Sequence, residues 1–287
     1  MELAQLLACI DEIDRVSNQA WLQSLDKRKR AELDFHNRDR DRQAARPLDQ
    51  DTYEKFYANK KYYNTVGLSQ RYVAAWIRQH APGKVFLDYA CGNGMLAVQA
   101  AQAGAALSLG LDISDVSVRN AQADAAAMSL SNARFFQADA ENTRLPDGSV
   151  DVIICSGMLH HLDLSYAFPE LRRILAPAGR ILAVEALDYN PAIKLYRKLT
   201  PAMRTEWESS HILSLKDVDF AKRFFDIGEL RFWHVVSYAA GRFPALLGLL
   251  NRIDSVLTRI PWIQRLAWIF TFELCSRKPP QTASASP

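Results

Sequence analysis

Two glycines and an aspartate lie in the segment LDYACGNGMLA, residues 87–97, where an apolar run gives way to a helix-like sequence. Gly92 and Gly94 carry no Cβ atom, so the backbone there can turn tightly and approach a ligand closely. The free N–H groups at the start of the following helix would point at that ligand. Asp88 can accept hydrogen bonds or balance a positive charge such as an ammonium group. The segment therefore predicts a binding site for a small molecule that carries positive charge.

Two further aspartates end the next two apolar runs of the chain. Asp112 lies 18 residues after Gly94, in LSLGLDIS (107–114), where an acidic side chain can bind the two hydroxyls of a ribose. Asp139 lies beside Ala140 at the end of ARFFQADA (133–140), and its carboxylate suits an exocyclic adenine amine. Parallel strands present their carboxyl ends at one edge of a sheet, where ligands bind. The aspartates therefore predict a nucleoside site at that edge.

The glycine spacing alone leaves two classes of ligand open. The pattern G-x-G-x-x-A, residues 92–97, also occurs in dinucleotide-binding sites. Such sites usually have apolar residues before the first glycine, because a pyrophosphate repels a nearby carboxylate. Asp88 therefore favours a cationic cofactor over NAD(P), and an NAD(P)-dependent dehydrogenase remains the alternative.

The adjacent histidines His160 and His161 follow the apolar run 151–159. A histidine can take a proton from a reacting hydroxyl, so both are candidates for catalysis; the alternative is that one of them caps or packs against the next helix. The other histidines and the cysteines are scattered along the sequence without metal-ligand spacing: His36, His80, His211, His234, Cys9, Cys91, Cys155 and Cys275. The sequence therefore predicts no metal site, and thiols that stay reduced.

The composition is that of a soluble globular protein. Of the 287 residues, 49% are hydrophobic and 23% are charged, and the formal net charge is +3, which leaves no strong basic footprint for nucleic acid. Glu2 stands where a signal peptide would carry positive charge. No apolar run approaches the length of about 18 residues that spans a membrane. We expect a cytoplasmic protein without a nucleic-acid partner.

Residues 81–188 alternate apolar strands with helical segments. Strands are expected at 85–91, 107–114, 133–140, 151–159 and 180–187, and helices at 94–104, 116–128 and 164–175. Strands that are apolar throughout indicate a parallel α/β sheet covered by helices on both faces. Residues 189–278 break this alternation with an insertion of roughly 35 residues. Strands at 229–238 and 267–277 follow it, and the second is a candidate for an antiparallel strand.

The N-terminal region, residues 1–80, is predicted to form a helical cap. Its charge run, 27–46, is expected to form a solvated helix face and a polar connection. Aromatic residues gather in YEKFYANKKYYN, 53–64, and because aromatics are costly to leave in water they must cover something. They either pack an N-terminal helix or form a substrate lid, for which the candidates are Tyr53, Tyr57, Tyr62 and Tyr63. The tail, 279–287, is predicted to be disordered.

Residues from about 84 to 187 resemble the catalytic core of the class I S-adenosylmethionine-dependent methyltransferases, in particular the group that methylates quinone precursors, sterols and other small molecules. The matching pieces are LDYACGNG, GLDIS, FFQADAENTRLPDGSVDVIICSGMLHHL and ELRRILAPAGRILAVE. The resemblance implies a Rossmann-like, seven-stranded sheet whose last strand is antiparallel. It also implies S-adenosylmethionine as the cofactor and S-adenosylhomocysteine as the product.

The resemblance further implies which residues hold the cofactor. Asp88, Gly92 and Gly94 would hold its methionine moiety, and Ser156 and Gly157 would flank it near the transferred methyl group. The remaining contacts of the expected site come from Asp112 to the ribose, from Asp139 and Ala140 to the adenine, and from Ala90 and Ile113 within the matched motifs. The fourth strand lacks the Asn/Asp-Pro-Pro-Tyr/Phe motif of enzymes that methylate planar nitrogens, which counts against DNA and many protein substrates.

The C-terminal third suggests the chemical character of the acceptor. Residues 231–274 are rich in aromatic residues and contain the leucine cluster ALLGLL (245–250). Arg252 and Arg259 lie seven residues apart in the helical stretch 243–260. Such a helix suits a membrane surface or the rim of an apolar cleft, although packing of the last strands is the alternative. We therefore expect methyl transfer to an oxygen or carbon of a lipid, quinone, polyketide or terpenoid-like acceptor, with peripheral membrane contact through this region. A protein that binds the cofactor without transferring a methyl group is the other alternative.

Overall fold

The computed structural model describes residues 2–17, 19–42, 60–201 and 204–277 of the chain. Two of the lid candidates, Tyr53 and Tyr57, lie outside these residues. The tail 279–287, for which the sequence predicts disorder, also lies outside them.

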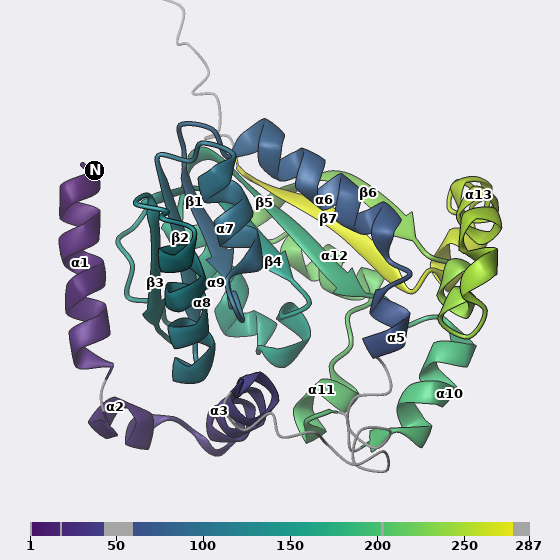
Figure 1. Cartoon of the computed structure of the whole chain (residues 1–287), viewed down its shortest axis with the longest axis horizontal. Helices are drawn as coiled ribbons and strands as arrows, with labels where there is room; N and C mark the ends of the chain where they lie inside the picture. Colours follow the sequence, from purple (N-terminus) through teal and green to yellow (C-terminus); the bar gives the residue numbers. More distant parts are fainter. Residues whose placement is uncertain (1, 18, 43–59, 202–203, 278–287) are drawn as a thin grey trace, which may run out of the picture.

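A seven-stranded sheet forms the centre of the fold (Figure 1), with the strand order β3-β2-β1-β4-β5-β7-β6. The strands are β1 Val85–Tyr89, β2 Leu107–Asp112, β3 Ala133–Gln137, β4 Val150–Ser156, β5 Leu175–Ala186, β6 Phe225–Trp233 and β7 Ile269–Ser276. The pairings among β1 to β5 are parallel, and β7 is antiparallel to its neighbours β5 and β6. The predicted Rossmann-like, mostly parallel sheet with an antiparallel last strand is therefore confirmed.

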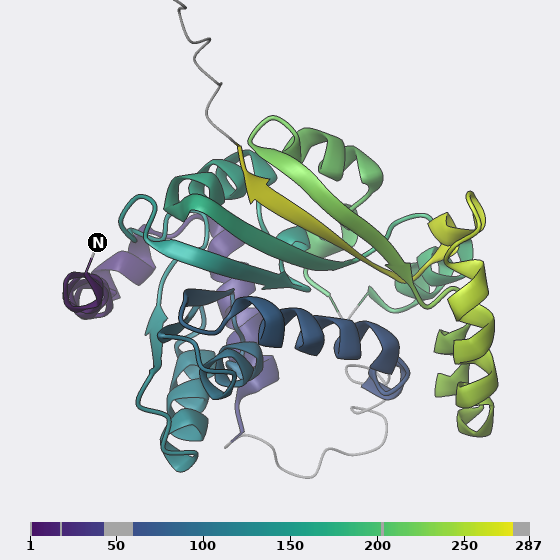
Figure 2. The same cartoon turned by 90° about the horizontal axis from the view of Figure 1, so that it is seen from above.

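Helices cover both faces of this sheet (Figure 2). The covering helices are α6 Gly67–His80, α7 Met95–Gln102, α8 Asp115–Ala127, α9 Leu164–Ile174 and α12 Leu215–Ala221. Successive strand residues point to opposite faces: Phe86 and Ile154 are buried with α6 and α7, whereas Leu87 and Ile153 are buried with α9 and α12. Both faces are apolar, which explains why the strands are apolar throughout rather than alternating.

The strand ends differ from the sequence-based expectation by two or three residues at β1 to β4, and β6 begins at Phe225 instead of 229; two other differences have a clear cause in the pairing or the backbone. β5 begins at Leu175 instead of 180, because Leu175 pairs with Val150 before a register shift in the β4–β5 ladder. The strand expected at 229–238 ends at Trp233, because His234 has a φ of 63° that turns the chain out of the sheet. Apolar runs do not reveal such irregularities of pairing.

The segments outside the alternating core lie at its ends. The N-terminal helices are α1 Leu3–Val16, α2 Gln19–Ser24, α3 Lys27–Arg40 and α5 Lys60–Tyr63. The insertion after β5 contributes α10 Pro191–Leu199 and α11 Glu206–Ser210, and α13 Leu247–Leu257 precedes β7. In Figure 1, α1 lies beyond β3, α3 lies below the strands, and α10 and α13 lie at the opposite end of the molecule from α1. None of the described helices is both long and apolar enough to cross a membrane.

The left-handed turn after β6 holds a buried histidine that makes the fold sensitive to acid. His234 is fully buried, and its two ring nitrogens lie 3.0 Å from Ser69 Oγ and 2.8 Å from Ser237 Oγ. Burial lowers the pKa of His234 from 6.5 to about 4, against the opposing charge of Asp254. Between these two pKa values the unfolded chain binds a proton that the folded protein excludes, so folding stability falls as the pH decreases.

We expect acidification from pH 7 to pH 5 to cost the folded protein about 2 kcal/mol through His234 alone. Urea unfolding of the wild type and of His234→Gln at both pH values isolates this contribution, because the other titrating groups are common to both proteins. The variant should lose about 2 kcal/mol less than the wild type over this range. An equal loss in the two proteins would mean that His234 is not the acid-sensitive group.

Candidate functional site

A cavity of about 370 Å³ opens at the carboxyl ends of the parallel strands. It collects nearly all of the residues that the sequence assigns to the cofactor: Asp88, Ala90, Gly92, Asp112, Ile113, Asp139, Ala140, Ser156 and Gly157. Gly94 does not line it. With a φ of 74°, Gly94 instead faces the interior, where an added Cβ would lie 2.5 Å from the ring of Phe135 and 2.7 Å from Ala121. Gly94 therefore permits close packing between the glycine turn, α8 and β3.

Asp112 and Asp139 use both carboxylate oxygens within the protein. Asp112 accepts the backbone N–H groups of Gly92 and Ser114, each at 2.8 Å. Asp139 accepts a backbone N–H two residues further on, and its Oδ2 lies 2.6 Å from Nζ of Lys29. A carboxylate oxygen accepts more than one hydrogen bond, so both side chains can still receive donors from a ligand in the cavity.

Asp88 lies in β1 and is buried, and its side chain reaches the first turn of α7. Its Oδ2 accepts the backbone N–H of Ala97, the third residue of that helix, at 3.1 Å. Burial raises the pKa of Asp88 to about 8; the hydrogen bond from Ala97 opposes this rise, and the charge of Asp112 adds to it. A nearby positive charge favours the ionised form of a carboxyl group. A cationic ligand beside Asp88 is therefore expected to displace its proton.

Helix α3 forms a wall of the cavity with one face, while Lys27, Arg30, Asp34 and Arg38 are exposed, so only part of the helix is the solvated charged face expected from its sequence. Lys29 Nζ lies 2.6 Å from Asp139 Oδ2, and Arg28 Nη2 lies 2.6 Å from Glu141 Oε1. Both cations are largely buried by these contacts. The charge run pairs with acids that follow β3 more than 100 residues later in the chain, so the sequence alone could not reveal its partners.

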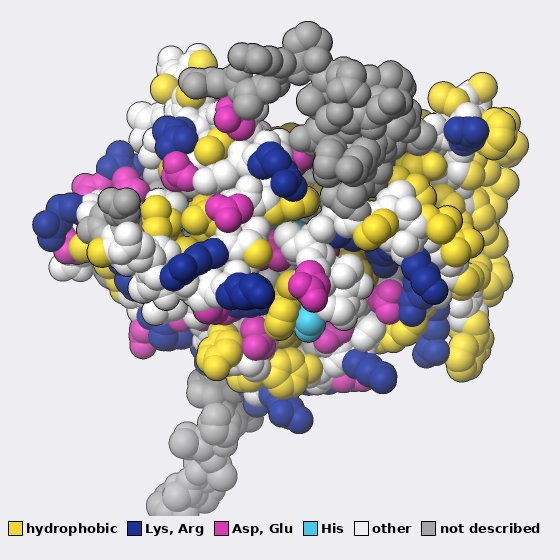
Figure 3. Space-filling view, turned by 90° about the horizontal axis from the view of Figure 1, so that it is seen from below, with side chains coloured by type: hydrophobic (Ala, Val, Ile, Leu, Met, Phe, Trp, Pro, Cys, Tyr) yellow, Lys and Arg dark blue, Asp and Glu magenta, His cyan; other side chains and the backbone are white. Residues whose placement is uncertain are grey.

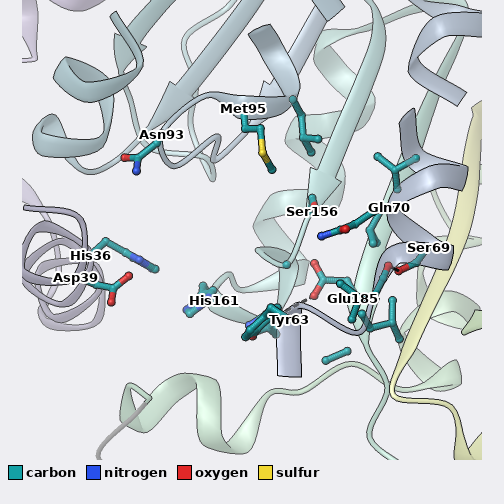
Figure 4. A pocket seen from close by; sticks show the side chains of 18 of the residues that line it. His36, Asp39, Tyr63, Ser69, Gln70, Asn93, Met95, Ser156, His161 and Glu185 are labelled. Atoms are coloured by element: carbon teal, nitrogen blue, oxygen red, sulfur yellow. Dashed lines mark hydrogen bonds and ion pairs between the residues drawn. The ribbon is translucent and has the colours of Figure 1, made fainter. Parts of the chain in front are cut away.

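A second cavity of about 1100 Å³ adjoins the first (Figure 4). Ser156 and Gly157 line both cavities and lie at the end of β4, so they mark the boundary between them. The larger cavity has a mixed lining: α5, α6 and the segment around β7 contribute most of its apolar side chains, and α3 with the residues after it contributes charged ones, among them Arg38, Asp39 and Arg40. Its apolar and aromatic lining includes Tyr63, Val66, Val73, Leu96, Trp268 and Ile269.

The two described lid candidates differ in their positions. Tyr63 lines the larger cavity, and its ring lies 5.5 Å from that of Trp268 (Figure 4). Tyr62 does not line the cavity; its ring lies 5.6 Å from that of Tyr196 and packs against Gly241. The aromatic segment therefore supplies both a cavity wall and packing, which are the two alternatives that the sequence left open.

His160 is paired with a buried glutamate at the end of β5. His160 Nδ1 lies 2.6 Å from Glu185 Oε2, while Glu185 Oε1 accepts the backbone N–H groups of Met158 and Leu159 at 2.9 and 2.8 Å. Nδ1 therefore carries the proton, and Nε2 is left as an acceptor. Burial lowers the pKa of His160, but the charge and hydrogen bond of Glu185 outweigh it and the net shift is upward. Both side chains line the larger cavity.

Glu185 is a site residue that the sequence-based reasoning missed. It is 1% exposed in a strand whose neighbours are apolar. A lone acidic residue in an apolar strand was the available signal, since a buried carboxylate needs partners. Those partners lie around 25 residues earlier in the chain, which sequence spacing does not show.

His161 points toward α3 instead of toward Glu185. Its Nδ1 lies 2.9 Å from Glu32 Oε2, and its ring lies 5.0 Å from that of His36. Burial lowers the pKa of His161 to about 4, and the charge of His160 lowers it further. The two adjacent histidines therefore have different partners, and the sequence did not predict that His36 would join them.

Comparison with known proteins finds similarity to methyltransferases. Residues 86–179 match the family model described as a methyltransferase domain. A 27-O-demethylrifamycin SV methyltransferase from Amycolatopsis mediterranei is 34% identical over 34% of this chain and 37% of its own length. A demethylmenaquinone methyltransferase from Thermus thermophilus is 36% identical over 37% of this chain and 49% of its own. A ribosomal protein L11 methyltransferase from Neisseria meningitidis is 39% identical over 26% of this chain and 23% of its own.

These matches span less than half of each of the three relatives. A solved structure covers more of the chain: magnesium protoporphyrin IX methyltransferase from Synechocystis PCC 6803 with bound SAH aligns with a TM-score of 0.56. That alignment covers 87% of this chain and 100% of the other at 20% sequence identity, so it shows a shared fold.

Proposed function

We propose that the chain is a class I S-adenosylmethionine-dependent methyltransferase that transfers a methyl group to an oxygen or carbon of a small, largely apolar acceptor; the methyltransferase domain matched by residues 86–179 supports the methyl transfer. The observation that carries this proposal is the junction of the two cavities at Ser156 and Gly157. The smaller cavity suits the cofactor, and the larger one, which contains His160, suits the acceptor.

The chemistry of the smaller cavity fits the cofactor. Asp112 and Asp139 offer carboxylate oxygens to a ribose and an adenine amine, and Asp88 offers a carboxyl group to a positive charge. Ser117 Oγ lines the same cavity and is buried without a hydrogen-bond partner among the described residues. Buried hydroxyls are normally satisfied, so this one supports a polar ligand there. We assign the cofactor to these residues, with Gly92 allowing its close approach.

The larger cavity supports a small apolar acceptor rather than a polymer. It is a concave site that combines an apolar wall, with Tyr63, Trp268 and aliphatic side chains, and a polar wall that contains arginines and acids; small-molecule sites commonly pair apolar surface with polar groups that fix orientation. The relatives' names span a rifamycin, a demethylmenaquinone and a ribosomal protein. The apolar lining favours acceptors of the first two kinds, such as a lipid, quinone, polyketide or terpenoid-like molecule.

The residues at the junction account for the transfer. When bound, S-adenosylmethionine supplies an electrophilic methyl group on a sulfonium. Holding the acceptor beside the shared wall at Ser156 and Gly157 orients it for in-line attack. His160 Nε2 accepts the proton from an acceptor hydroxyl, and Glu185 stabilises the imidazolium and fixes its orientation. We further propose that residues 1–80 cap the site, that 81–188 form the cofactor-binding core, and that 189–278 complete the sheet and the acceptor cavity.

Activity can be tested before the acceptor is known. The protein is incubated with methyl-labelled S-adenosylmethionine and an organic extract of the cells from which it comes. We expect label to enter the organic phase and to stay out of the precipitated protein. Label in protein alone would contradict the small-molecule assignment, and no label with any fraction would favour a cofactor-binding protein without turnover.

Replacing Asp112 tests the cofactor site. In Asp112→Ala the ribose loses charge-assisted hydrogen bonding worth roughly 1.5–3 kcal/mol in total, so the affinity for S-adenosylmethionine should fall about tenfold to hundredfold. Calorimetric titration measures the change, and Asp219→Ala, at an exposed carboxylate on α12, is the matched control. Unchanged affinity in a folded Asp112→Ala protein would remove this residue from the ribose site.

The end of the molecule formed by α13 and the residues around it presents an exposed apolar surface with arginines among its residues. In Figure 3, hydrophobic side chains gather at the end where Figure 1 places α13. The exposed apolar residues between 243 and 266 are Phe243, Leu246, Leu249, Ile253, Val256, Ile260, Trp262 and Leu266. Trp262 is 75% exposed. We name these eight residues the apolar end patch.

The charges around the apolar end patch favour an anionic bilayer as its partner. Residues 241–266 contain Arg242, Arg252, Arg259 and Arg265. Their one acid, Asp254, is 1% exposed and accepts the backbone N–H groups of Val236 and Ser237. An apolar face with a basic border binds at the interface of anionic membranes. Peripheral membrane contact at this end would let the acceptor cavity collect lipid-soluble molecules.

Flotation with liposomes tests this contact. The wild type should float with vesicles that contain anionic lipid at low salt, and Leu249→Ser/Trp262→Ser should remain in the pellet fraction while it still binds S-adenosylmethionine. Leu230→Ser, on β6 away from the patch, is the control. Failure of the wild type to float, or a stable dimer that dissociates in the double variant, would contradict a membrane partner.

A further inference from the structure

A glutamate and two histidines from distant parts of the chain converge where the two cavities meet. Glu32 and His36 lie four residues apart on α3, which puts them on one face of the helix, and His161 follows β4. One ligand atom from each of the three lies within 4.8 Å of the others. Glu32 Oε2 lies 2.9 Å from His161 Nδ1 and 3.6 Å from His36 Nε2. The sequence predicts no metal site because these histidines are 125 residues apart.

The donor set and its spacing suit a transition-metal ion. Two imidazoles and a carboxylate are common ligands of Zn²⁺. Tetrahedral Zn²⁺ with bonds of about 2.0–2.1 Å places neighbouring ligand atoms roughly 3.3 Å apart. The distances of 2.9 and 3.6 Å from Glu32 Oε2 lie on either side of that value. His161 would bind through Nδ1 with its proton on Nε2.

Glu32 is a buried carboxylate that lacks the usual cationic partner. It is 5% exposed, and among the described residues its ion pairs are with His36 and His161 only. The nearby cations Arg28 and Lys29 are paired with acids that follow β3. A buried negative charge is costly unless a cation or several donors compensate it. Hydrogen bonds with His161 and Thr205 compensate Glu32 in the metal-free protein, and a metal ion at this position would replace the histidine proton with a full positive charge.

A second layer of contacts holds the ligands in place. Thr205 Oγ1 donates to Glu32 Oε1 at 2.6 Å, which leaves Oε2 toward the histidines. Such hydrogen bonds orient metal ligands and raise affinity. His160, His161 and Glu208 form a second group with one ligand atom each within 4.8 Å, so further donors face the same space. The three ligands therefore come from α3 and the turn after β4, and Thr205 and Glu208, at α11, lie against them.

We propose that Glu32, His36 and His161 bind a divalent transition-metal ion, Zn²⁺ by its donor set, at the boundary between the cavities. His36 and His161 line both cavities, so the position left open by three protein ligands would face the space where the two cavities meet. Resting on the proposed methyl transfer, the ion would bind the acceptor's hydroxyl oxygen and make its proton easier to remove. The ion would also hold α3 in place beside the smaller cavity.

Metal binding is measured directly on untagged, full-length protein freed of metal by chelation. Titration with Co²⁺ should give one equivalent of the visible absorption of tetrahedral cobalt, and Zn²⁺ should displace it. His36→Ala and Glu32→Gln should each weaken binding at least hundredfold. His211→Ala, which removes a histidine on the surface beyond α11, should leave binding unchanged.

The outcomes separate the metal site from the proposed function. No cobalt spectrum in the wild type, or the same spectrum in His36→Ala, would overturn the site. If label transfer continues after metal binding is lost completely, the ion does not act on the acceptor, and its role is to hold α3 in place. A faster release of S-adenosylmethionine from His36→Ala would then support that role. One bound equivalent with no methyl transfer to any fraction would support the metal site and contradict the function.

Discussion

Replacing His160 by alanine is expected to lower kcat for methyl transfer by roughly 10²- to 10⁴-fold while leaving the affinity for S-adenosylmethionine unchanged. His160 lines the acceptor cavity and is not among the residues that line the cofactor cavity, so its loss removes the proton acceptor without removing a cofactor contact. The initial rate of label transfer into the organic phase, at saturating extract, measures the effect. Calorimetric titration with the cofactor provides the affinity.

Two further variants distinguish proton transfer from simple packing at this position. Glu185→Gln keeps an oxygen for the backbone N–H groups of Met158 and Leu159 but loses the negative charge that faces His160 Nδ1. As a positioning residue, Glu185 should affect kcat more than KM in this variant. His211→Ala serves as the control for removing a histidine outside the cavities. Full activity in His160→Ala would indicate an acceptor that is already ionised, such as a carboxylate, which needs no base.

The core of the fold could be predicted because its signals are local. Each parallel strand is a mainly apolar run, and Asp112 and Asp139 mark the places where two of the runs end. Parallel pairing brings such ends to one edge whatever the rest of the chain does. This is why the residues expected at the cofactor site gather in one cavity, although they come from four separate strands and turns.

The groups missed by the sequence depend on contacts between distant segments. Lys29 and Asp139 are 110 residues apart, and Glu32 and His161 are 129 apart. The composition of a charged segment does not show whether its side chains face water or distant acids such as Asp139 and Glu141. The sequence therefore predicted a solvated face for α3 and did not predict these ion pairs. The packing role of Gly94 depends on distant contacts in the same way. Its φ of 74° fits a glycine turn at a ligand, but the neighbours that require a glycine there are Phe135 and Ala121.

The glycine turn offers a matched pair of substitutions that separates packing from ligand binding. In Gly94→Ala, the new Cβ meets the Phe135 ring and Ala121 at 2.5 and 2.7 Å, and the backbone keeps a left-handed φ. Overpacking costs about 1–3 kcal/mol and left-handed backbone about 1–2 kcal/mol. The free energy of unfolding should therefore fall by about 2–5 kcal/mol. In Gly92→Ala the new Cβ would lie 3.1 Å from the flexible end of Arg40, so the loss should be limited to about 1–2 kcal/mol.

Urea unfolding of the two alanine variants measures this difference. Because Gly92 lines the cavity, calorimetry should show that the free energy of cofactor binding falls by more than the free energy of unfolding in Gly92→Ala. A Phe135→Leu substitution removes the ring atoms that the Gly94→Ala methyl group would meet. The double variant should therefore be more stable than the sum of the two single effects predicts, by about 1 kcal/mol or more. Additive effects, or equal destabilisation by the two glycine substitutions, would mean that the ring of Phe135 is not what requires glycine at position 94. Equal destabilisation would leave the strain of the left-handed backbone, which the two positions share, as the whole cost, whereas additivity alone would leave Ala121 as the neighbour that requires glycine.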